Sequence, residues 1–477
     1  MPTLKTTALA LAALISAGCR FKRETGTDDT SPAESARTVV IITVDTIRPR
    51  VLHGADQGWD VAPTVTAFQQ DAVWFPQTYS PRGMTAVALS SMLTGTYPRT
   101  HLVRTNEEPE LLTGLTLADR FHDLGYLTLG YAANQGKLLD FGFDEATVAN
   151  QRDPDTLPED QDEIGQVAND QLLLDTFTAR LAEVPEGEKI FVWVHLNLPH
   201  SPYYELTPWF EQFHPEPYQG TLDTTDDANL NLVTMGARPF DEADQLYLEA
   251  VYAGEIRVAD DTIAAFLAAL DGAGRLEDGI VVVGADHGEE LGDHNTYFFH
   301  GCSPYNSVLN VEYAFRAPGR WPQGVTVDAP ISLVDIAPTV LELAGAEPMA
   351  GELFGHSVVA EVQDGVAPSH DIFFERGVQT AGIVRGDWKY ILTPEGEFDL
   401  CTPYSTAEGA AYPAEVEELY HLSVDPDEAD DLAAQEETER ASLSQATCAW
   451  VQSAEWVPSY MVESNALLTW CTENWPE

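Results

Sequence analysis

The sequence predicts an α/β fold with a mostly parallel sheet flanked by helices, followed by a smaller C-terminal region. From residue 38 onward, short apolar runs alternate with helical stretches, which is typical of parallel strands joined by helices. The apolar runs are rich in β-branched residues, as expected of strands buried on both faces. After about residue 355 the strand-like runs shorten and turn residues become frequent, which indicates a change of architecture.

Individual elements follow from length and periodicity. We expect strands at 38–44, 126–132, 190–196 and 279–284, and helices at 115–124, 166–182, 244–270 and 331–344. Pro338 would lie near the first turns of the last helix, where proline is tolerated. In the C-terminal region, residues 382–392 are the clearest strand or hairpin.

The composition excludes two classes of protein. Of 477 residues, 44% are hydrophobic and 10% aromatic, which excludes a disordered chain. The 77 acidic residues outnumber 24 basic ones, for a net charge of −53. Nucleic-acid binding needs lysine and arginine to neutralise phosphates, so we expect no nucleic-acid partner. The acidic stretches 151–164 and 425–431 are interpreted as solvated surface.

The N-terminus is interpreted as an export signal. The apolar run at 8–17 is too short to span a membrane but fits a signal sequence, and it ends at Cys19. This resembles a bacterial lipoprotein signal over residues 1–19, which implies a lipid anchor at Cys19 in the cell envelope, periplasmic or surface-exposed. The alternative is an ordinary signal peptide. The polar residues 20–37 would form a tether.

The cysteines agree with export. Besides Cys19 there are four, at 302, 401, 448 and 471, enough for two disulfides with three possible connectivities. Proximity in sequence favours a bond between Cys448 and Cys471. Four unpaired thiols remain the alternative.

Ionisable residues follow three of the expected strands. Asp45 follows 38–44, Asp286 and His287 follow 279–284, and His200 follows 190–196. Ligands of such sheets bind beyond the carboxyl ends of the strands. Carboxylates and imidazoles that converge there are most simply neutralised by a divalent metal ion. His195 lies within its strand, and we favour a structural role for it.

Residues 83–95 predict a short helix that begins near Thr85 and ends at Gly95. The N-terminus of a helix favours an anion, and a hydroxyl there beside a metal could attack phosphorus or sulfur. The alternative is that Thr85 only caps the helix.

The order of several motifs resembles the sulfatase family of the alkaline phosphatase superfamily. The resemblance runs from about 38 to 432. It rests on segments that include VVIITVDTIRPRVL at 39–52, MLTGTYPRTH at 92–101, VHLNLPHSPY at 194–203, VVVGADHGEELGDH at 281–294 and SLVDIAPTVLELAG at 332–345.

This resemblance implies a fold and a set of roles. The fold would be an alkaline-phosphatase-like α/β domain over 38–355 and a C-terminal subdomain with an antiparallel sheet over 356–477. The implied metal ligands are Asp45, Asp286, His287 and Thr85. The implied catalytic residues are Thr85 as nucleophile, with His200 and His300 contacting the ester oxygens and assisting the leaving group.

The sequence departs from the family pattern at three positions. The usual signature begins with Cys or Ser, which is oxidised to formylglycine, whereas this chain has Thr85. An arginine that supports the nucleophile is replaced by Leu89. The second aspartate that often follows Asp45 is Thr46.

The resulting expectation is a metal-dependent hydrolase that cleaves sulfate esters of a small molecule or a glycan. The family implies Ca²⁺, with Mg²⁺, Mn²⁺ or Zn²⁺ as alternatives. Two other functions stay open: a phosphodiesterase or phosphonate hydrolase that uses Thr85, and a non-catalytic anion-binding lipoprotein. A second metal would need further ligands, for which His294 and His300 are candidates. The aromatic segment 203–240 is either a substrate lid or an insertion packed on the main domain. The sequence does not set the oligomeric state.

Overall fold

The computed structural model describes most of the chain from residue 35 onward. The described residues are 35–54, 57–107, 112–149, 165–214, 216–234, 236–298, 300–301, 303–347, 349, 355–376, 379–394, 416–453 and 466–475. The expectations for the signal segment with Cys19, the tether as far as residue 34, the acidic stretch 151–164, and Cys302 and Cys401 fall outside them.

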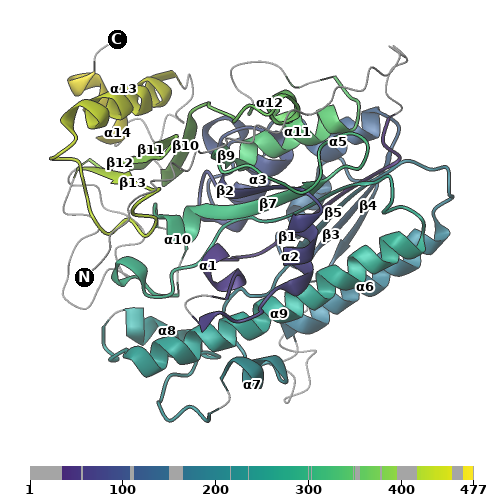
Figure 1. The fold of residues 1–477 in the computed structure, drawn as a ribbon, viewed down its shortest axis with the longest axis horizontal. Coiled ribbons are helices and arrows are strands. Elements are labelled where there is room, and N and C mark those ends of the chain that lie inside the picture. The colour runs from purple at the N-terminus through teal and green to yellow at the C-terminus, as the bar shows by residue number, and fades with distance from the viewer. Residues whose placement is uncertain are drawn as a thin grey trace, which may run out of the picture. The chain divides into compact units, whose positions relative to one another are not determined.

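A large sheet forms the centre of the main region (Figure 1), with the strand order β4-β3-β5-β1-β6-β7-β2-β8 and with β9 paired to β2. Strand β7 is antiparallel to β6 and to β2, and the other pairings are parallel, which confirms the mostly parallel sheet. Its strands are β1 (Thr38–Val44), β2 (Val73–Tyr79), β3 (Leu127–Ala132), β4 (Glu145–Val148), β5 (Ile190–Leu196), β6 (Ile280–Ala285), β7 (Asn310–Arg316), β8 (Val325–Thr326) and β9 (Ile331–Ser332).

Helices cover both faces of this sheet (Figure 1). One face carries α1 (Pro49–Leu52), α2 (Pro63–Gln70), α6 (Gly165–Glu183) and α9 (Glu242–Gly272). The other carries α3 (Thr85–Thr94), α5 (Leu117–Asp123), α11 (Ile336–Leu343) and α12 (Val359–Asp364). Shorter elements are η3 (Gly136–Asp140), α4 (Pro98–His101), α7 (Trp209–Phe213), α8 (Asp227–Thr234), η5 (Asp293–Asn295), α10 (Asn306–Leu309) and η6 (Leu333–Asp335).

The strands and long helices lie close to the predicted ranges, with one difference at 331–344. There β9 and the short helix η6 come first, and α11 begins only at Ile336. Ser332 accepts a hydrogen bond from the backbone N–H of Val334, and Asp335 accepts one from the backbone of Ser332. These polar side chains stabilise a turn before the helix.

Helix α3 is buried along its whole length. Its hydroxyl residues do not break it, because Ser90, Ser91 and Thr94 each donate to the carbonyl four residues earlier. The helix ends as predicted at Gly95, which has φ 67° in the left-handed region that glycine adopts without strain. Thr85 is therefore the first residue of a rigid, buried helix.

A second sheet forms the C-terminal part, with the antiparallel order β10-β11-β12-β13. Helix α13 packs on β11 and β12, and the disulfide between Cys448 and Cys471 joins α13 to α14, as predicted. The elements are β10 (Ile372–Arg376), β11 (Thr380–Arg385), β12 (Trp388–Leu392), β13 (Glu417–His421), α13 (Glu437–Ser453) and α14 (Ala466–Asn474).

The junction between the two sheets corrects one expectation. The stretch 425–431 was predicted to be solvated surface, but Glu428 is buried and forms a 2.6 Å ion pair with Lys389 of β12. Burying a lysine and a carboxylate costs desolvation energy, and direct contact between the two charges offsets this cost. In the described part of the chain, no helix combines the length and the apolarity that crossing a membrane requires.

Candidate active site

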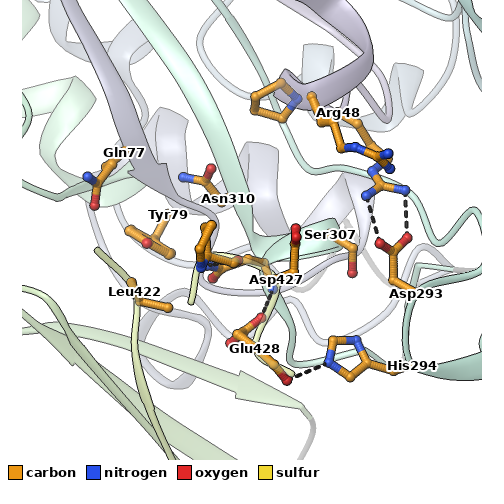
Figure 2. Close-up of a pocket in the computed structure, with 14 residues that line it drawn as sticks. Arg48, Gln77, Tyr79, Asp293, His294, Ser307, Asn310, Leu422, Asp427 and Glu428 are labelled. Atoms are coloured by element: carbon orange, nitrogen blue, oxygen red, sulfur yellow. Dashed lines mark hydrogen bonds and ion pairs between the residues drawn. The ribbon is translucent and has the colours of Figure 1, made fainter. Parts of the chain in front are cut away.

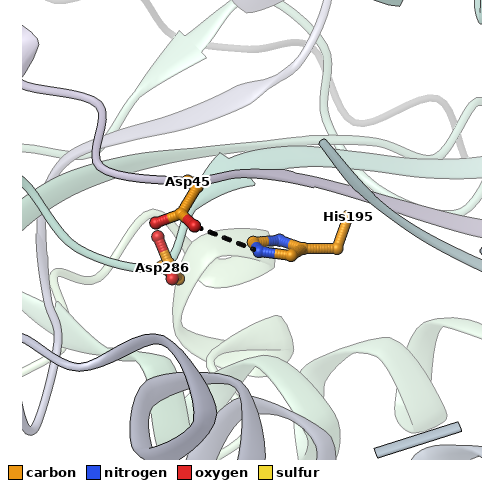
Figure 3. A group of neighbouring side chains, drawn as sticks. All are labelled: Asp45, His195 and Asp286. Atoms are coloured by element: carbon orange, nitrogen blue, oxygen red, sulfur yellow. Dashed lines mark ion pairs between the residues drawn. The ribbon is translucent and has the colours of Figure 1, made fainter. Parts of the chain in front are cut away.

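Three adjacent strands deliver the central residues of the site. Strand β1 lies between β5 and β6, with Thr43 opposite His195 and with Val44 opposite Ala285. Asp45 follows β1 directly, and Asp286 and His287 follow β6. Asp45, His195 and Asp286, the three side chains in Figure 3, therefore meet near the carboxyl edge of the sheet, where ligands of such folds bind.

Three buried ligand atoms of these neighbouring residues have no hydrogen-bond partner. They are Oδ1 of Asp45, Nε2 of His195 and Oδ2 of Asp286, and the side chains of all three residues are fully buried. One ligand atom from each lies within 4.8 Å of the others, a spacing that fits one metal ion. An orphaned buried polar atom costs about 1–3 kcal/mol, so a group of three indicates a missing partner.

The other atoms of the two carboxylates are held by the protein. Oδ1 of Asp286 accepts the backbone N–H of His287 at 2.8 Å and that of Thr46 at 3.2 Å. Thr46 has φ 54°, a strained conformation for a β-branched residue. Oδ2 of Asp45 accepts a 2.6 Å bond from Nδ2 of Asn134. These bonds fix the orientation in which the remaining oxygens point at one another.

His287 adds a fourth group with a defined tautomer. Its Nδ1 lies 2.9 Å from the carbonyl oxygen of Gly288, which can only accept, so Nδ1 carries the proton. Nε2 is then the lone-pair nitrogen, 3.4 Å from Asp286 and 3.7 Å from Asp45. Burial, with His300 nearby, lowers the pKa of His287 to about 3, so its imidazole is neutral.

The charges of this group call for a cation. Burial and the Asp45 carboxylate raise the pKa of Asp286 well above its usual value. At Asp45, burial acts in the same direction, but His200 and the two other histidines outweigh it and lower the pKa. Two buried carboxyl groups beside the neutral imidazole of His287 fit a divalent metal ion.

Thr85 lies beside this group at the start of α3. Its Oγ1 is 3.3 Å from Nε2 of His287, and the residue is buried. The N-cap is Met84, not Thr85, so the hydroxyl is not used to cap the helix. The backbone N–H of Ala86 is already bonded to Oδ1 of Asn106. Part of the expected anion site at this helix end is therefore occupied by a side chain.

His200 and His300 lie next to one another and next to His287. The ring centroids of His200 and His300 are 5.3 Å apart, and those of His287 and His300 are 4.5 Å apart. Nδ1 of His200 donates to the carbonyl of Ser201 at 2.7 Å. Nδ1 of His300 lies 3.2 Å from both oxygens of Glu289. The structure thus gathers all six predicted site residues around one point.

Glu289 favours the protonated form of His300. Burial lowers the pKa of His300, but the buried Glu289 carboxylate raises it more, so the pKa lies above the usual value. Gly83 allows the backbone of His300 to approach the start of α3, since a Cβ there would lie 2.6 Å from the His300 carbonyl oxygen. A protonated imidazole beside a hydroxyl and a metal site is suited to donate a proton to a leaving group.

Sequence reasoning missed His195, Asn134 and Glu289 as members of the site. His195 was expected to be structural, yet its Nε2 is 3.8 Å from Asp45. Asn134 lies just beyond the end of β3. The two aspartates were predicted because they follow strands, so the same criterion could have identified Asn134. Glu289 lies two residues beyond His287, where a turn brings it back toward His300.

The departures at Leu89 and Thr46 are visible in the structure. Leu89 is part of the hydrophobic core, so no polar side chain comes from that position. Thr46 donates its backbone N–H to Asp286, and its hydroxyl is buried without a hydrogen-bond partner. The site therefore lacks both of the side chains that the family pattern would place there.

A separate cavity of about 220 Å³ lies away from these residues (Figure 2). It lies between the β1–α1 turn, β7 and residues 422–428. Two of the charged residues that line it form ion pairs, Arg48 with Asp293 and Glu428 with Lys389. His294 lines it, stacks on Tyr305 and contacts the carbonyl of Glu428, so it does not join the metal group. Among the described residues, only Asp45, His195 and Asp286 form a cluster with metal-ligand spacing.

The aromatic segment 203–240 packs on the main region. Tyr218 stacks on Tyr247 of α9 with ring centroids 3.9 Å apart, and Phe210 meets the same tyrosine edge-on. Tyr203 is buried and donates to Glu289. These contacts match the packing alternative, and Tyr203 links the segment to the site.

A model of the sulfatase family matches residues 37–346. Arylsulfatase K of Danio rerio is 28% identical over 197 residues, which cover 39% of this chain and 35% of that protein. An ulvan-active sulfatase of Formosa agariphila is 25% identical over 364 residues, 72% of this chain and 68% of that protein. The chain spans between 34% and 52% of the length of the first curated relatives it matches.

Solved structures share the fold. One, a complex with its substrate D-glucosamine-2-N,6-O-disulfate, matches with a TM-score of 0.67 and 15% identity over 91% of this chain and 99% of that one. The phosphonate monoester hydrolase of Agrobacterium radiobacter matches with a TM-score of 0.64 and 18% identity over 88% and 95%. Because the family model covers more than half of the sequence, the chain belongs to the sulfatase family.

Proposed function

We propose that this protein is a metal-dependent hydrolase that cleaves sulfate esters with Thr85 as the nucleophile. The observation that carries the proposal is the position of Thr85 Oγ1, 3.3 Å from His287 and beside the orphaned oxygens of the two aspartates. Asp45, Asp286 and His287 would hold the metal. When bound, a divalent ion supplies Lewis-acid charge next to the hydroxyl and the ester oxygens.

The remaining roles follow from the hydrogen bonds. Thr85 releases its hydroxyl proton to water as its Oγ1 forms a bond to sulfur, in line with the ester S–O bond that breaks, and the leaving alcohol takes a proton from His300. Glu289 raises the pKa of His300 and so favours the form that can donate this proton. His200 uses Nδ1 to bond the carbonyl of Ser201, which leaves its other nitrogen available to contact the ester beside His300. Water then hydrolyses the Thr85 sulfate.

A sulfated sugar is the substrate class that the relatives favour. One solved neighbour binds a disulfated glucosamine, and a curated relative is an ulvan-active sulfatase. The phosphonate monoester hydrolase among the structural neighbours makes phosphoryl esters the second candidate. If neither ester is cleaved, the third candidate remains, a protein that binds an anion without catalysis.

The test compares kcat/KM on an aryl sulfate and on an aryl phosphodiester for the wild type, Thr85→Ala and Thr85→Ser. We expect sulfate cleavage to fall on the order of 10³-fold or more in Thr85→Ala and to survive in part in Thr85→Ser, which keeps a hydroxyl. A sulfated Thr85 peptide trapped by acid quench would identify the nucleophile directly. Full activity of Thr85→Ala would refute the assignment, and dominant phosphodiester cleavage would change the substrate class.

We also propose that the protein is exported and lipid-anchored at Cys19. The disulfide between Cys448 and Cys471 supports an oxidising compartment, since such bonds are rare where thiols are kept reduced. Labelling with a radioactive fatty acid should mark the wild type and not Cys19→Ser. Equal labelling of both proteins would contradict the anchor.

A further inference from the structure

His195 occupies a position in the site that the expected ligand set leaves unexplained. Thr46 has a hydroxyl and not a carboxylate, so Asp45 and Asp286 are the only carboxylates in the metal-spaced cluster of the described residues. The third member of that cluster is the imidazole of His195, delivered by β5 next to β1. Its Nε2 is buried and has no hydrogen-bond partner.

The neighbours of His195 determine which nitrogen carries the proton. Nδ1 lies 3.0 Å from Oγ1 of Thr43. That hydroxyl accepts the indole N–H of Trp193 at 3.1 Å, and it lies 3.1 Å from the carbonyl oxygen of Val194, to which it donates its one proton. The hydroxyl is then left as an acceptor for His195, so Nδ1–H donates to it. The lone pair is on Nε2, directed at Asp45 and Asp286.

This arrangement is the one that a metal-binding histidine needs. A ligating imidazole donates its other N–H to a fixed acceptor, which sets the tautomer and the ring orientation. Thr43 provides that acceptor from the same strand that supplies Asp45. An ordinary structural histidine in a core would have both nitrogens paired.

We propose that His195 is a metal ligand that takes the place of the missing second carboxylate, and that the site therefore selects a zinc-type ion over Ca²⁺. The inference rests on the metal site of the proposed function but not on its ester substrate. Asp45, Asp286, His195 and His287 then offer two carboxylates and two imidazoles, with Thr85 as a further oxygen.

The chemistry of this donor set differs from that of a calcium site. Ca²⁺ takes about six to eight oxygen ligands. Zn²⁺ is usually coordinated by about four ligands, and imidazole nitrogens together with carboxylate oxygens are common among them. Replacing a carboxylate by His195 also leaves the site with one negative charge fewer, which weakens the binding of a hard ion more than that of zinc.

The experiment measures metal binding and not turnover. Full-length metal-free protein is titrated with Zn²⁺ and with Ca²⁺ by calorimetry, and Co²⁺ is added to report the ligand geometry by its visible absorption. The variants are His195→Asn, Thr43→Val, and His101→Asn as a matched control. His101 is also a buried histidine, but it contacts Ser91 away from the metal group.

The expected result is a wild type that binds Zn²⁺ at least about 100-fold more tightly than Ca²⁺. His195→Asn should weaken Zn²⁺ binding by at least about 10–100-fold, change the Co²⁺ spectrum, and alter Ca²⁺ binding little. Thr43→Val keeps the ligand and the shape of the side chain, so a loss of about tenfold there would report the lost acceptor even if His195→Asn folds poorly.

Unchanged Zn²⁺ affinity and an unchanged Co²⁺ spectrum in folded His195→Asn would overturn the proposal. A wild type that prefers Ca²⁺ would overturn it as well. If no ester is cleaved but the zinc signature depends on His195, the proposed sulfatase activity fails and this inference stands. If the His195→Asn variant cleaves sulfate esters with Ca²⁺, the proposed sulfatase activity stands and this inference fails.

Discussion

Two regions of this protein bury charged side chains, and they treat them in opposite ways. At the junction with the second sheet, Lys389 and Glu428 pair with each other, and Glu375 of β10 pairs with Arg99 and Arg104. At the edge of the main sheet, Asp45 and Asp286 each keep one buried oxygen that has no hydrogen-bond partner. Buried charges cost several kcal/mol unless they are paired. Charges paired within the chain hold its parts together, whereas charges left unpaired prepare a site for a ligand.

The largest effect is expected from Lys389→Met at the junction. It removes the cation from Glu428 and leaves a buried carboxylate, so the free energy of unfolding should fall by about 3–5 kcal/mol. Urea denaturation monitored by tryptophan fluorescence measures this. The double variant with Glu428→Gln should recover part of the loss. A change below about 1 kcal/mol would mean that the pair is solvated.

Loss of the disulfide tests the covalent link in the same region. Cys448 and Cys471 are 23 residues apart in sequence, and opening a loop of that size costs about 3 kcal/mol. The Cys448→Ser, Cys471→Ser variant should melt earlier than the wild type by calorimetry, while its affinity for the metal stays the same. A lower metal affinity would show that the two regions are coupled.

Asp286→Asn should act in the opposite direction from Lys389→Met when no metal is present. The raised pKa of Asp286 means that folding favours its protonated form, so the metal-free wild type loses stability as the pH rises above about 4. The amide keeps the bonds from Thr46 and His287 without the charge, so the variant should be about 1–2 kcal/mol more stable at neutral pH. Denaturation in a chelator across pH measures this.

The gain of Asp286→Asn should disappear when a divalent metal is added, because the ion stabilises the wild type more. If the metal-free variant is instead less stable than the wild type at every pH, the Asp286 carboxylate stabilises the fold through contacts within the chain, as Glu428 does.

The smallest effect is expected at His370, which pairs with the buried Asp335 at 2.8 Å. Burial lowers the pKa of His370, but Asp335 raises it more, so the pKa lies above its usual value. The stabilisation is complete below the unfolded pKa of about 6.5 and is lost as the pH rises through the folded value. His370→Asn should therefore cost on the order of 1 kcal/mol at pH 5.5 and less at pH 8.5, by thermal denaturation. A pH-independent difference would contradict the ion pair.

The fold could be predicted from the sequence because its strands are uniformly apolar and its helices are long and periodic. Strands β1 and β5 match the expected ranges, and Asp45, Asp286 and His287 could be predicted to meet because each follows a strand of one parallel sheet. His195 could not be assigned, since which nitrogen is free depends on Thr43 and Trp193, whose contacts exist only after the strands pair.

The burial of Glu428 escaped prediction for a similar reason. Its partner Lys389 is distant in sequence, and an acidic stretch is more often solvated. Local sequence patterns therefore predicted where the strands end, but not which charged residues that are distant in sequence form ion pairs.

The placement of the site residues has a consequence for how such a protein can change over evolution. The aspartates and His287 follow strands directly, and His195 lies within one, so their spacing is set by the paired backbone of the sheet. His200 and His300 come from loops beyond the strands, where insertions and replacements are tolerated. A lineage can therefore exchange the loops that meet the ester while inheriting the ion-holding edge intact, so new substrates are accessible in single steps that leave the metal chemistry in place.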